Sequence, residues 1–216
     1  MTAIFIAWAV SAALLVLLAL VVGRLAALGK WLGILVDDRY RFSLTQLQIV
    51  TWSIVILSLI SGVFFGRLLA GVKAPLDFTI PSQVLALLGI SAGSAVTAIP
   101  IKATKDPAKI GSAEPRFRQV FLAEEGTYAD KVIDVTKYQN FITTIILVAA
   151  YVTLSIHAIH DAGSARAVTS LPDISGTFLV LLAISHGAYL AAKVPSKAGD
   201  PLVESVAQRR AAPATG

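Results

Sequence analysis

The sequence predicts an all-α integral membrane protein with five transmembrane helices, and three observations lead to this fold class. Hydrophobic residues make up 56% of the 216 residues and charged residues only 14%, against about 25% charged residues in soluble domains. Several stretches without charge are long enough to cross the ~30 Å hydrocarbon layer of a bilayer. Motifs in the first half of the chain recur in the same order in the second half. We therefore expect one helix followed by a tandem duplicated two-helix hairpin.

The apolar stretches place the five spans in chain order. The first covers about residues 3–23, and we interpret it as a retained helix because no cationic residue precedes it, unlike in a cleaved signal peptide. Residues 24–36 keep apolar side chains at helical spacing around Lys30 and Trp31, which predicts an extension of this helix in the head-group region. The other spans are expected at about 47–66, 81–101, 141–160 and 176–192.

These spans divide the chain into five segments. The first helix with its interfacial extension occupies 1–42, and the first hairpin repeat occupies 43–103. A cytoplasmic loop is expected at 104–133 and the second hairpin repeat at 134–197. The polar, low-complexity segment 198–216 is expected to form a disordered cytoplasmic tail.

The distribution of basic residues predicts the orientation in the membrane. With five spans, 15 of the 18 Lys and Arg residues fall on one side, and only Arg67, Lys73 and Arg166 fall on the other. The positive-inside rule makes the richer side cytoplasmic, so the N-terminus faces out and the C-terminus faces in. This topology accounts for the net charge of +5 without a nucleic-acid partner. Cysteine is absent, which excludes disulfides and thiolate metal sites.

Two alignments of the chain with itself predict the duplication. At an offset of 91 residues, Thr45 and Gln48 align with Thr136 and Gln139, and Pro81 aligns with Pro172. At an offset of 94, the segment 87–93 aligns with 181–187. Because each unit holds two helices, both copies have the same orientation and the pseudo-symmetry axis is expected along the membrane normal.

Polar residues of both copies are expected in one layer within the inner leaflet. They are Thr45, Gln48, Ser91, Thr136, Gln139, Ser185, His186 and Tyr189. In one interpretation these hydroxyls and amides only join helices by hydrogen bonds. In the other they line a path for an ion or solute, and His186 could relay protons because an ionisable residue within a span is a functional candidate.

Small residues spaced by four indicate tight helix packing, within one chain or between copies. The positions singled out are Gly62, Gly66, Gly89, Gly93, Ala183 and Gly187. They indicate close approach of helices and no chemistry of their own.

Catalytic and metal sites have weaker support. Residues 89–93 match the G-x-S-x-G pattern, but that pattern needs a strand and an exposed turn around the serine. Ser91 with His186 resembles in outline the dyad of rhomboid intramembrane proteases, although Ala92 departs from their Gly-x-Ser-Gly motif and their sixth span is lacking. His157, His160 and Asp161 have a spacing that could hold a divalent metal. Glu124 and Glu125 could pair with Arg116 and Arg118 or contact a partner protein. No catalytic residue, metal or cofactor is predicted.

Three segments, 121–126, 134–139 and 184–190, resemble a group of uncharacterised bacterial inner-membrane proteins. The resemblance spans about residues 37–197 and implies a bacterial multi-pass protein, but it implies no activity, cofactor or partner.

The sequence favours a non-enzymatic membrane scaffold or anchor in the bacterial inner membrane. We expect a homo-oligomer embedded in the bilayer, with the loop 104–133 and the tail contacting a cytoplasmic protein partner. The alternative is an ion or proton channel or a small-solute transporter that uses the polar layer. Against transport, no expected span contains Asp or Glu, the usual residues for cation coupling.

Overall fold

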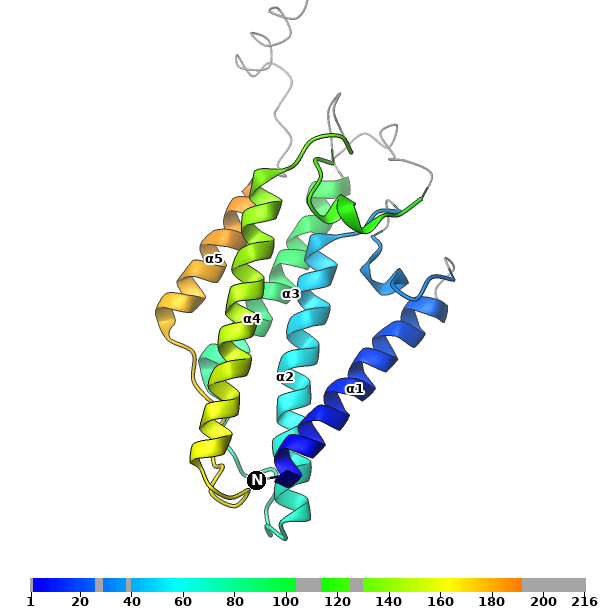
Figure 1. Ribbon diagram of the computed structural model, residues 1–216. Coiled ribbons are helices and arrows are strands. Elements are labelled where there is room, and N and C mark those ends of the chain that lie inside the picture. The colour runs from blue at the N-terminus through cyan, green and yellow to red at the C-terminus, as the bar shows by residue number, and fades with distance from the viewer. Residues whose placement is uncertain (1, 26–28, 38–39, 104–113, 125–129, 192–216) are drawn as a thin grey trace, which may run out of the picture.

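The computed structural model describes residues 2–25, 29–37, 40–103, 114–124 and 130–191, except for the side chains of 94–103. These residues confirm the all-α class, with no strand among them (Figure 1). The helices are α1 (Thr2–Leu25), α2 (Leu44–Leu69), α3 (Ser82–Ala103), α4 (Val135–Asp161) and α5 (Gly176–Ala191), with the 3-10 helices η1 (Gly33–Leu35) and η3 (Phe117–Val120). The predicted tail 198–216 and the loop residues 104–113 and 125–129 lie outside the described part of the chain.

Three of these helices, α1, α2 and α4, are long and apolar enough to cross a membrane. This finding supports a membrane protein. Helix α5 is shorter, and of α3 the described side chains cover the apolar part Ser82–Gly93. The described helices exceed the predicted spans by a few residues at most ends; α4, for example, begins at Val135 and not near residue 141.

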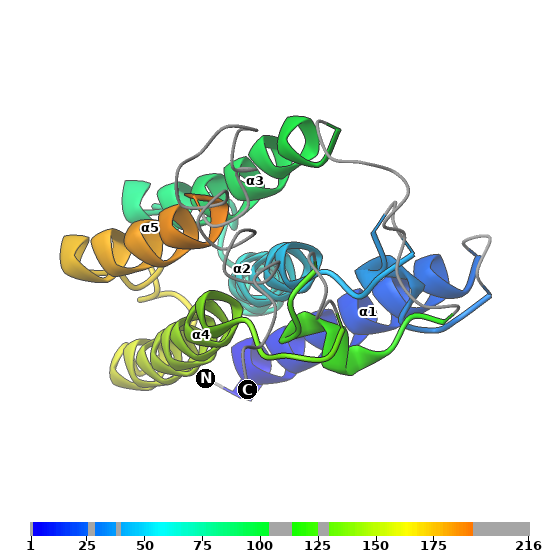
Figure 2. The ribbon, with the colours of Figure 1, turned by 90° about the horizontal axis from the view of Figure 1, so that it is seen from above.

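The bundle has two distinct ends. At one end, which we call the cap end, α2 and α4 begin and the described loop residues 114–124 and 130–134 lie over them (Figure 1). We call these loop residues the cap. At the other end, the turn end, lie residue 2 and the turns 70–81 and 162–175. Seen along the helices, α3 lies beside α5, α2 lies between α3 and α4, and α1 packs on the outer side of α2 (Figure 2).

Local residue chemistry sets where α2 and α4 begin and end. The Ser43 hydroxyl accepts a hydrogen bond from the Gln46 amide, and Asp134 accepts bonds from the Thr136 and Lys137 amides. Side chains of this kind satisfy donors that a helix start leaves unpaired. After each helix, a glycine with positive φ turns the chain: Gly71 at 71° and Gly163 at 68°.

Residues 29–36 do not continue α1, so the predicted helical extension is wrong. Gly29 has a φ of 57°, a conformation that ends a helix, and the chain then turns into η1. The backbones of Gly23 and Gly33 lie against each other, so that any Cβ at either position would overlap the other's backbone. Of the apolar residues at helical spacing in this segment, Leu35 is buried, whereas Trp31 and Leu32 are exposed.

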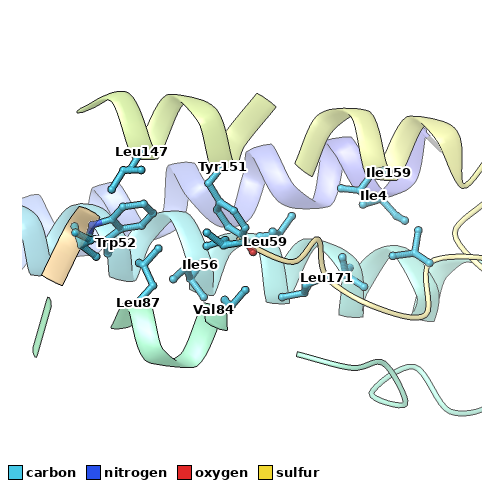
Figure 3. Packing of buried hydrophobic residues seen from close by; sticks show 14 of the residues in the cluster. Ile4, Trp52, Ile56, Leu59, Val84, Leu87, Leu147, Tyr151, Ile159 and Leu171 are labelled. Carbon is cyan, nitrogen blue, oxygen red and sulfur yellow. The ribbon is translucent and has the colours of Figure 1, made fainter. Parts of the chain in front are cut away.

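The main core consists of buried apolar residues from all five α-helices and from the turn 162–175. Trp52, Ile56 and Leu59 of α2 form its centre, with Leu147 and Tyr151 of α4 facing them (Figure 3). A second, smaller core beneath the cap contains Leu35, Phe42, Leu44, Val120 and Tyr189. The cap is therefore packed onto the helices and is part of the fold.

The turn end is joined by backbone contacts between the two turns. Thr79 and Ser170 form a parallel bridge, in which the Thr79 amide donates to the Thr169 carbonyl and the Leu171 amide donates to the Thr79 carbonyl, each at 2.9 Å. The buried Arg67 guanidinium donates to the carbonyls of Ala74, Asp77 and Val168. One cation thus holds both turns together.

Candidate functional site

A buried polar cluster lies between α2, α4 and α5 towards the cap end. The Asn140 amide oxygen accepts from Gln48 Nε2 at 2.9 Å and from the Ser185 hydroxyl at 3.0 Å. The Thr144 hydroxyl accepts from the same Gln48 nitrogen at 2.6 Å and donates to the Asn140 carbonyl at 2.9 Å. All four side chains are at most 4% exposed. Three helices are therefore joined through one hydrogen-bonded network.

A second contact lies closer to the cap. The Thr45 hydroxyl donates to the hydroxyl of Tyr189 at 3.3 Å, which links α2 to the last described turn of α5. His186 is buried on the same face of α5 between Ser185 and Tyr189, and Ser91 is buried on α3. Of the predicted polar layer, the members from α2, α3 and α5 are thus inside the bundle.

The two predicted members from α4 lie elsewhere. Gln139 is on the exposed side of α4, and the Thr136 hydroxyl donates to Asp134 at 2.6 Å in the helix cap. Asn140 and Thr144 occupy the buried face instead, and sequence analysis missed both. A signal was present: Lys137, Asn140, Thr144, Leu147 and Tyr151 recur at the spacing of one helix face, and all are buried.

The chemistry available to this network is that of neutral amides and hydroxyls. Two of its buried polar atoms, Gln48 Oε1 and Asn140 Nδ2, have no hydrogen-bond partner within the described residues, and the same holds for Ser91 Oγ on α3. Each such group costs free energy when it is kept from water, so its presence asks for an explanation. The same residues hold no group of three His, Asp or Glu side chains that could bind a metal.

Two cationic side chains fix the cap. Arg41 is 4% exposed and binds both carboxylate oxygens of Asp130, at 2.8 and 2.7 Å. Lys137 is 2% exposed and contacts Glu124 at 2.8 Å and the Leu122 carbonyl at 2.8 Å. Glu124, which the sequence suggested as a partner for the loop arginines, therefore pairs with Lys137. Glu125 lies outside the described residues.

Aromatic rings and a glutamine complete the cap. The rings of Phe42, Phe117, Phe121 and Phe141 form a series of edge-to-face contacts with centroid distances of 6.1, 6.2 and 4.9 Å. Such contacts add about 0.5–1.5 kcal/mol per pair beyond the buried area. The buried Gln119 side chain accepts from the Phe42 amide at 3.3 Å and from the Arg116 amide at 3.0 Å. The cap is thereby joined to the segment that precedes α2.

The predicted small-residue positions fall into two groups. A Cβ at Gly62 would lie 2.6 Å from the Trp8 Cβ, and a Cβ at Gly66 would overlap Ile4, so these two glycines allow α1 to approach α2. A Cβ at Gly89, Gly93 or Gly187 would meet nothing within 4 Å. Those three glycines and Ala183 are exposed on α3 and α5.

The predicted metal candidates lie on the surface near the turn end. His157, His160 and Asp161 are all exposed, and His160 Nδ1 is 3.6 Å from the Asp161 carboxylate. Among the described residues, these three included, no three His, Asp or Glu side chains lie close enough together to hold a metal ion.

Comparison with known proteins gives no relative from which a role could be transferred. Neither protein-family models, nor curated proteins, nor solved structures match the chain. The function must therefore be argued from the residues and their geometry.

Proposed function

We propose that this protein is a non-enzymatic scaffold or anchor of the bacterial inner membrane, which is homo-oligomeric and holds a cytoplasmic protein partner through its cap and tail. The observation that carries this proposal is the construction of the cap. Buried ion pairs fix the cap backbone. Beside them, Val132 and Ile133 of the cap and Val135 and Tyr138 of the first turn of α4 are 45–71% exposed, and we call these four residues the cap surface. A fixed surface with exposed apolar side chains is typical of a site for a protein partner.

The proposal places five spans in the membrane, with the N-terminus outside. In Figure 1, α3 and α5 run beside α2 and α4 from part-way along the bundle to the cap end, which supports their placement in the bilayer with α1, α2 and α4. The basic residues of the first loop, the long loop and the tail support a cytoplasmic cap end.

The tandem duplication of the hairpin is supported by the turn end. The parallel bridge joins Thr79 with Ser170, which are 91 residues apart, the offset at which the two halves align. Arg67 binds the carbonyls of Asp77 and Val168, which are also 91 residues apart. A two-fold axis along the helices would make equivalent extended segments parallel and in register, as the segments around Thr79 and Ser170 are.

Homo-oligomerisation is supported by the exposed faces of α3 and α5. Gly89 and Gly187 leave open space at these faces, and Ala183 is exposed beside them. In a bilayer, small residues on a helix surface allow a second helix to approach closely. A second copy of this chain is the partner proposed for this surface.

A photo-crosslinking experiment tests the scaffold function. Benzoylphenylalanine replaces Tyr138 on the cap surface, and in a matched control it replaces Phe65, an exposed aromatic residue of α2. In native membranes we expect Tyr138 to give a discrete adduct with another protein, and Phe65 to give lipid adducts. The amount of adduct should fall in Arg41→Gln, because this substitution removes the ion pair with Asp130 that fixes the cap. Absence of any protein adduct at Tyr138 would reject the scaffold.

Transport remains the second candidate, because the polar cluster leaves Gln48 Oε1, Asn140 Nδ2 and Ser91 Oγ without partners among the described residues. A chain of waters or a permeating ion would satisfy such atoms. Proteoliposomes that carry purified protein distinguish the two functions. A proton or ion flux that disappears in His186→Ala at unchanged expression would replace the scaffold by a channel or transporter, whereas the scaffold function requires flux equal to that of empty liposomes.

A serine protease receives less support from the geometry. A serine nucleophile is activated through a hydrogen bond to its base, and the buried Ser91 Oγ makes no hydrogen bond within the described residues. Labelling of Ser91 by an active-site serine probe would be evidence for protease activity, and absence of labelling would exclude it.

A further inference from the structure

A cavity of about 380 Å³ lies between α4 and the beginning of α5, with α2 and α3 behind it. Its inner wall is made of buried side chains: Trp52 from α2, Leu87 from α3, and Leu147 and Tyr151 from α4. These four side chains face one another across the space between the helices (Figure 3). The volume falls within the range of about 300–1,000 Å³ in which small-molecule sites occur, and such sites are mostly apolar.

The mouth of the cavity faces the side of the bundle and not its end. It is formed by Ala150, Leu154 and Phe178, which are exposed. Ala150 and Leu154 lie within α4, a helix long and apolar enough to cross a membrane, and more than one helical turn from either of its ends. In a bilayer this mouth would open into the hydrocarbon layer, so a molecule would enter from the lipid and not from water.

The inner wall carries a hydrogen-bond donor that the described residues do not use. The indole nitrogen of Trp52 is buried and has no hydrogen-bond partner within them. Buried polar atoms are normally paired, and buried tyrosine and tryptophan usually find an acceptor. The cavity is thus apolar with an unsatisfied donor in its wall, which suits an occupant that has a hydrocarbon part and an uncharged oxygen acceptor.

One rim of the cavity is polar and acidic. Asp173 and Ser175 line it just before α5 begins, on the side of the turn end. One oxygen of Asp173 accepts from the Ile174 amide at 2.7 Å. The carboxylate disfavours an anionic group at this rim and favours an ammonium group.

We propose that this cavity binds an acyl chain of an amine-bearing, zwitterionic membrane lipid. The chain lies against Leu87, Leu147 and Tyr151, an ester carbonyl accepts from the Trp52 indole nitrogen, and the ammonium head group lies at Asp173. This site is separate from the cap surface and does not depend on the proposed scaffold function. A scaffold that fails to bind a protein partner would still bind this lipid.

Quenching of Trp52 fluorescence by brominated acyl chains tests the site, because bromine quenches tryptophan at short range. The chain contains three tryptophans, so Trp8→Phe with Trp31→Phe leaves Trp52 alone. The protein is placed in vesicles of phosphatidylethanolamine and phosphatidylcholine in which the phosphatidylethanolamine is brominated. Although Trp52 is fully buried, we expect strong quenching.

Two substitutions at the side of α4 provide the decisive comparison. Ala150→Phe fills the mouth, whereas Ala149→Phe adds the same ring to an exposed neighbouring position that does not line the cavity. We expect Ala150→Phe to lose most of the Trp52 quenching and Ala149→Phe to keep it. Equal quenching in the two variants would overturn the proposal, because lipid outside the bundle would then account for all of it.

The head group is tested in the same vesicles. Brominated phosphatidylethanolamine should quench more than brominated phosphatidylglycerol at equal mole fraction, and Asp173→Asn should remove the difference. Equal quenching by both lipids in the unmodified protein would overturn the contact at Asp173. Where the single-tryptophan protein does not fold, native mass spectrometry of the otherwise unmodified chain replaces fluorescence. Retained phosphatidylethanolamine that is lost in Ala150→Phe and kept in Ala149→Phe supports the site, and equal retention rejects it.

Discussion

Arg41 is the residue on which the position of the cap depends most directly. Its guanidinium binds both oxygens of Asp130, and the two side chains are 4% and 19% exposed. In Arg41→Gln the carboxylate loses its charged partner in a largely buried place. Removing one partner of a buried pair costs about 3–5 kcal/mol, and because Asp130 keeps some contact with water we expect a loss near the lower limit.

Hydrogen exchange measures this effect at the cap backbone. The Ala123 amide donates to the Val132 carbonyl at 3.0 Å and the Asp134 amide donates to the Phe121 carbonyl at 2.8 Å, so both report on cap opening. Their protection should fall strongly in Arg41→Gln. Lys131→Gln, which removes an exposed charge from the same cap, should leave it unchanged. Similar protection in the two variants would show that the ion pair does not hold the cap.

At the scale of residues, the sequence identifies the kind of side chain but not the direction in which it points. Gln48 and Gln139 align in the two halves, yet Gln48 joins the network and Gln139 is exposed. Successive residues on a helix are rotated by about 100°, so Asn140 replaces Gln139 on the buried face. Only the spacing to Lys137 and Thr144 carries this information, and motif matching does not use it.

At the scale of elements, contact between α1 and α2 requires glycine on α2. A Cβ at Gly62 would lie 2.6 Å from the Cβ of Trp8, and that atom belongs to a helix and cannot move alone. Gly62→Leu should therefore displace α1 and destabilise the protein by at least the ~1–3 kcal/mol typical of overpacking. Phe65→Leu, at an exposed position of the same helix, is the control.

Thermal unfolding in detergent and Trp8 emission measure this displacement together. Trp8 donates from its indole nitrogen to the Ser58 hydroxyl at 3.1 Å, so loss of the contact should change its emission. An unchanged melting temperature in Gly62→Leu would mean that α1 does not pack through this glycine.

Helix positions were predictable because apolar composition over about 20 residues is a strong signal. The end of α1 was not, because a helical spacing of apolar residues also occurs in the turn at 29–36, where Leu35 is buried but Trp31 and Leu32 are exposed. Gly29, with a φ of 57°, was the available signal against an extended helix. The ion pair between Arg41 and Asp130 could not be predicted from the sequence either, because the two residues are 89 positions apart.

At the scale of the whole molecule, the two ends have different chemistry. The turn end is held by backbone hydrogen bonds and by Arg67, and the cap end is held by side-chain ion pairs and aromatic rings. Internal alignment leads to the expectation of equivalent turns, and it does not indicate that they pair with each other. That pairing depends on how close the two hairpins lie, which follows from packing of α3 beside α5.

The absence of cysteine from the chain allows a direct test of the five-span topology. Single cysteines replace Lys73 and Ser164 in the two turns and Lys131 in the cap, all of which are exposed. In intact cells, a membrane-impermeant maleimide should label the first two, and it should label the cap position only after permeabilisation. The physical reason is that α3 and α4 each separate a turn from the cap end. Labelling of Lys73→Cys and Lys131→Cys from the same side would mean that α3 does not cross the membrane. The protein would then have fewer than five spans, and its orientation would have to be derived again from the basic residues on each side.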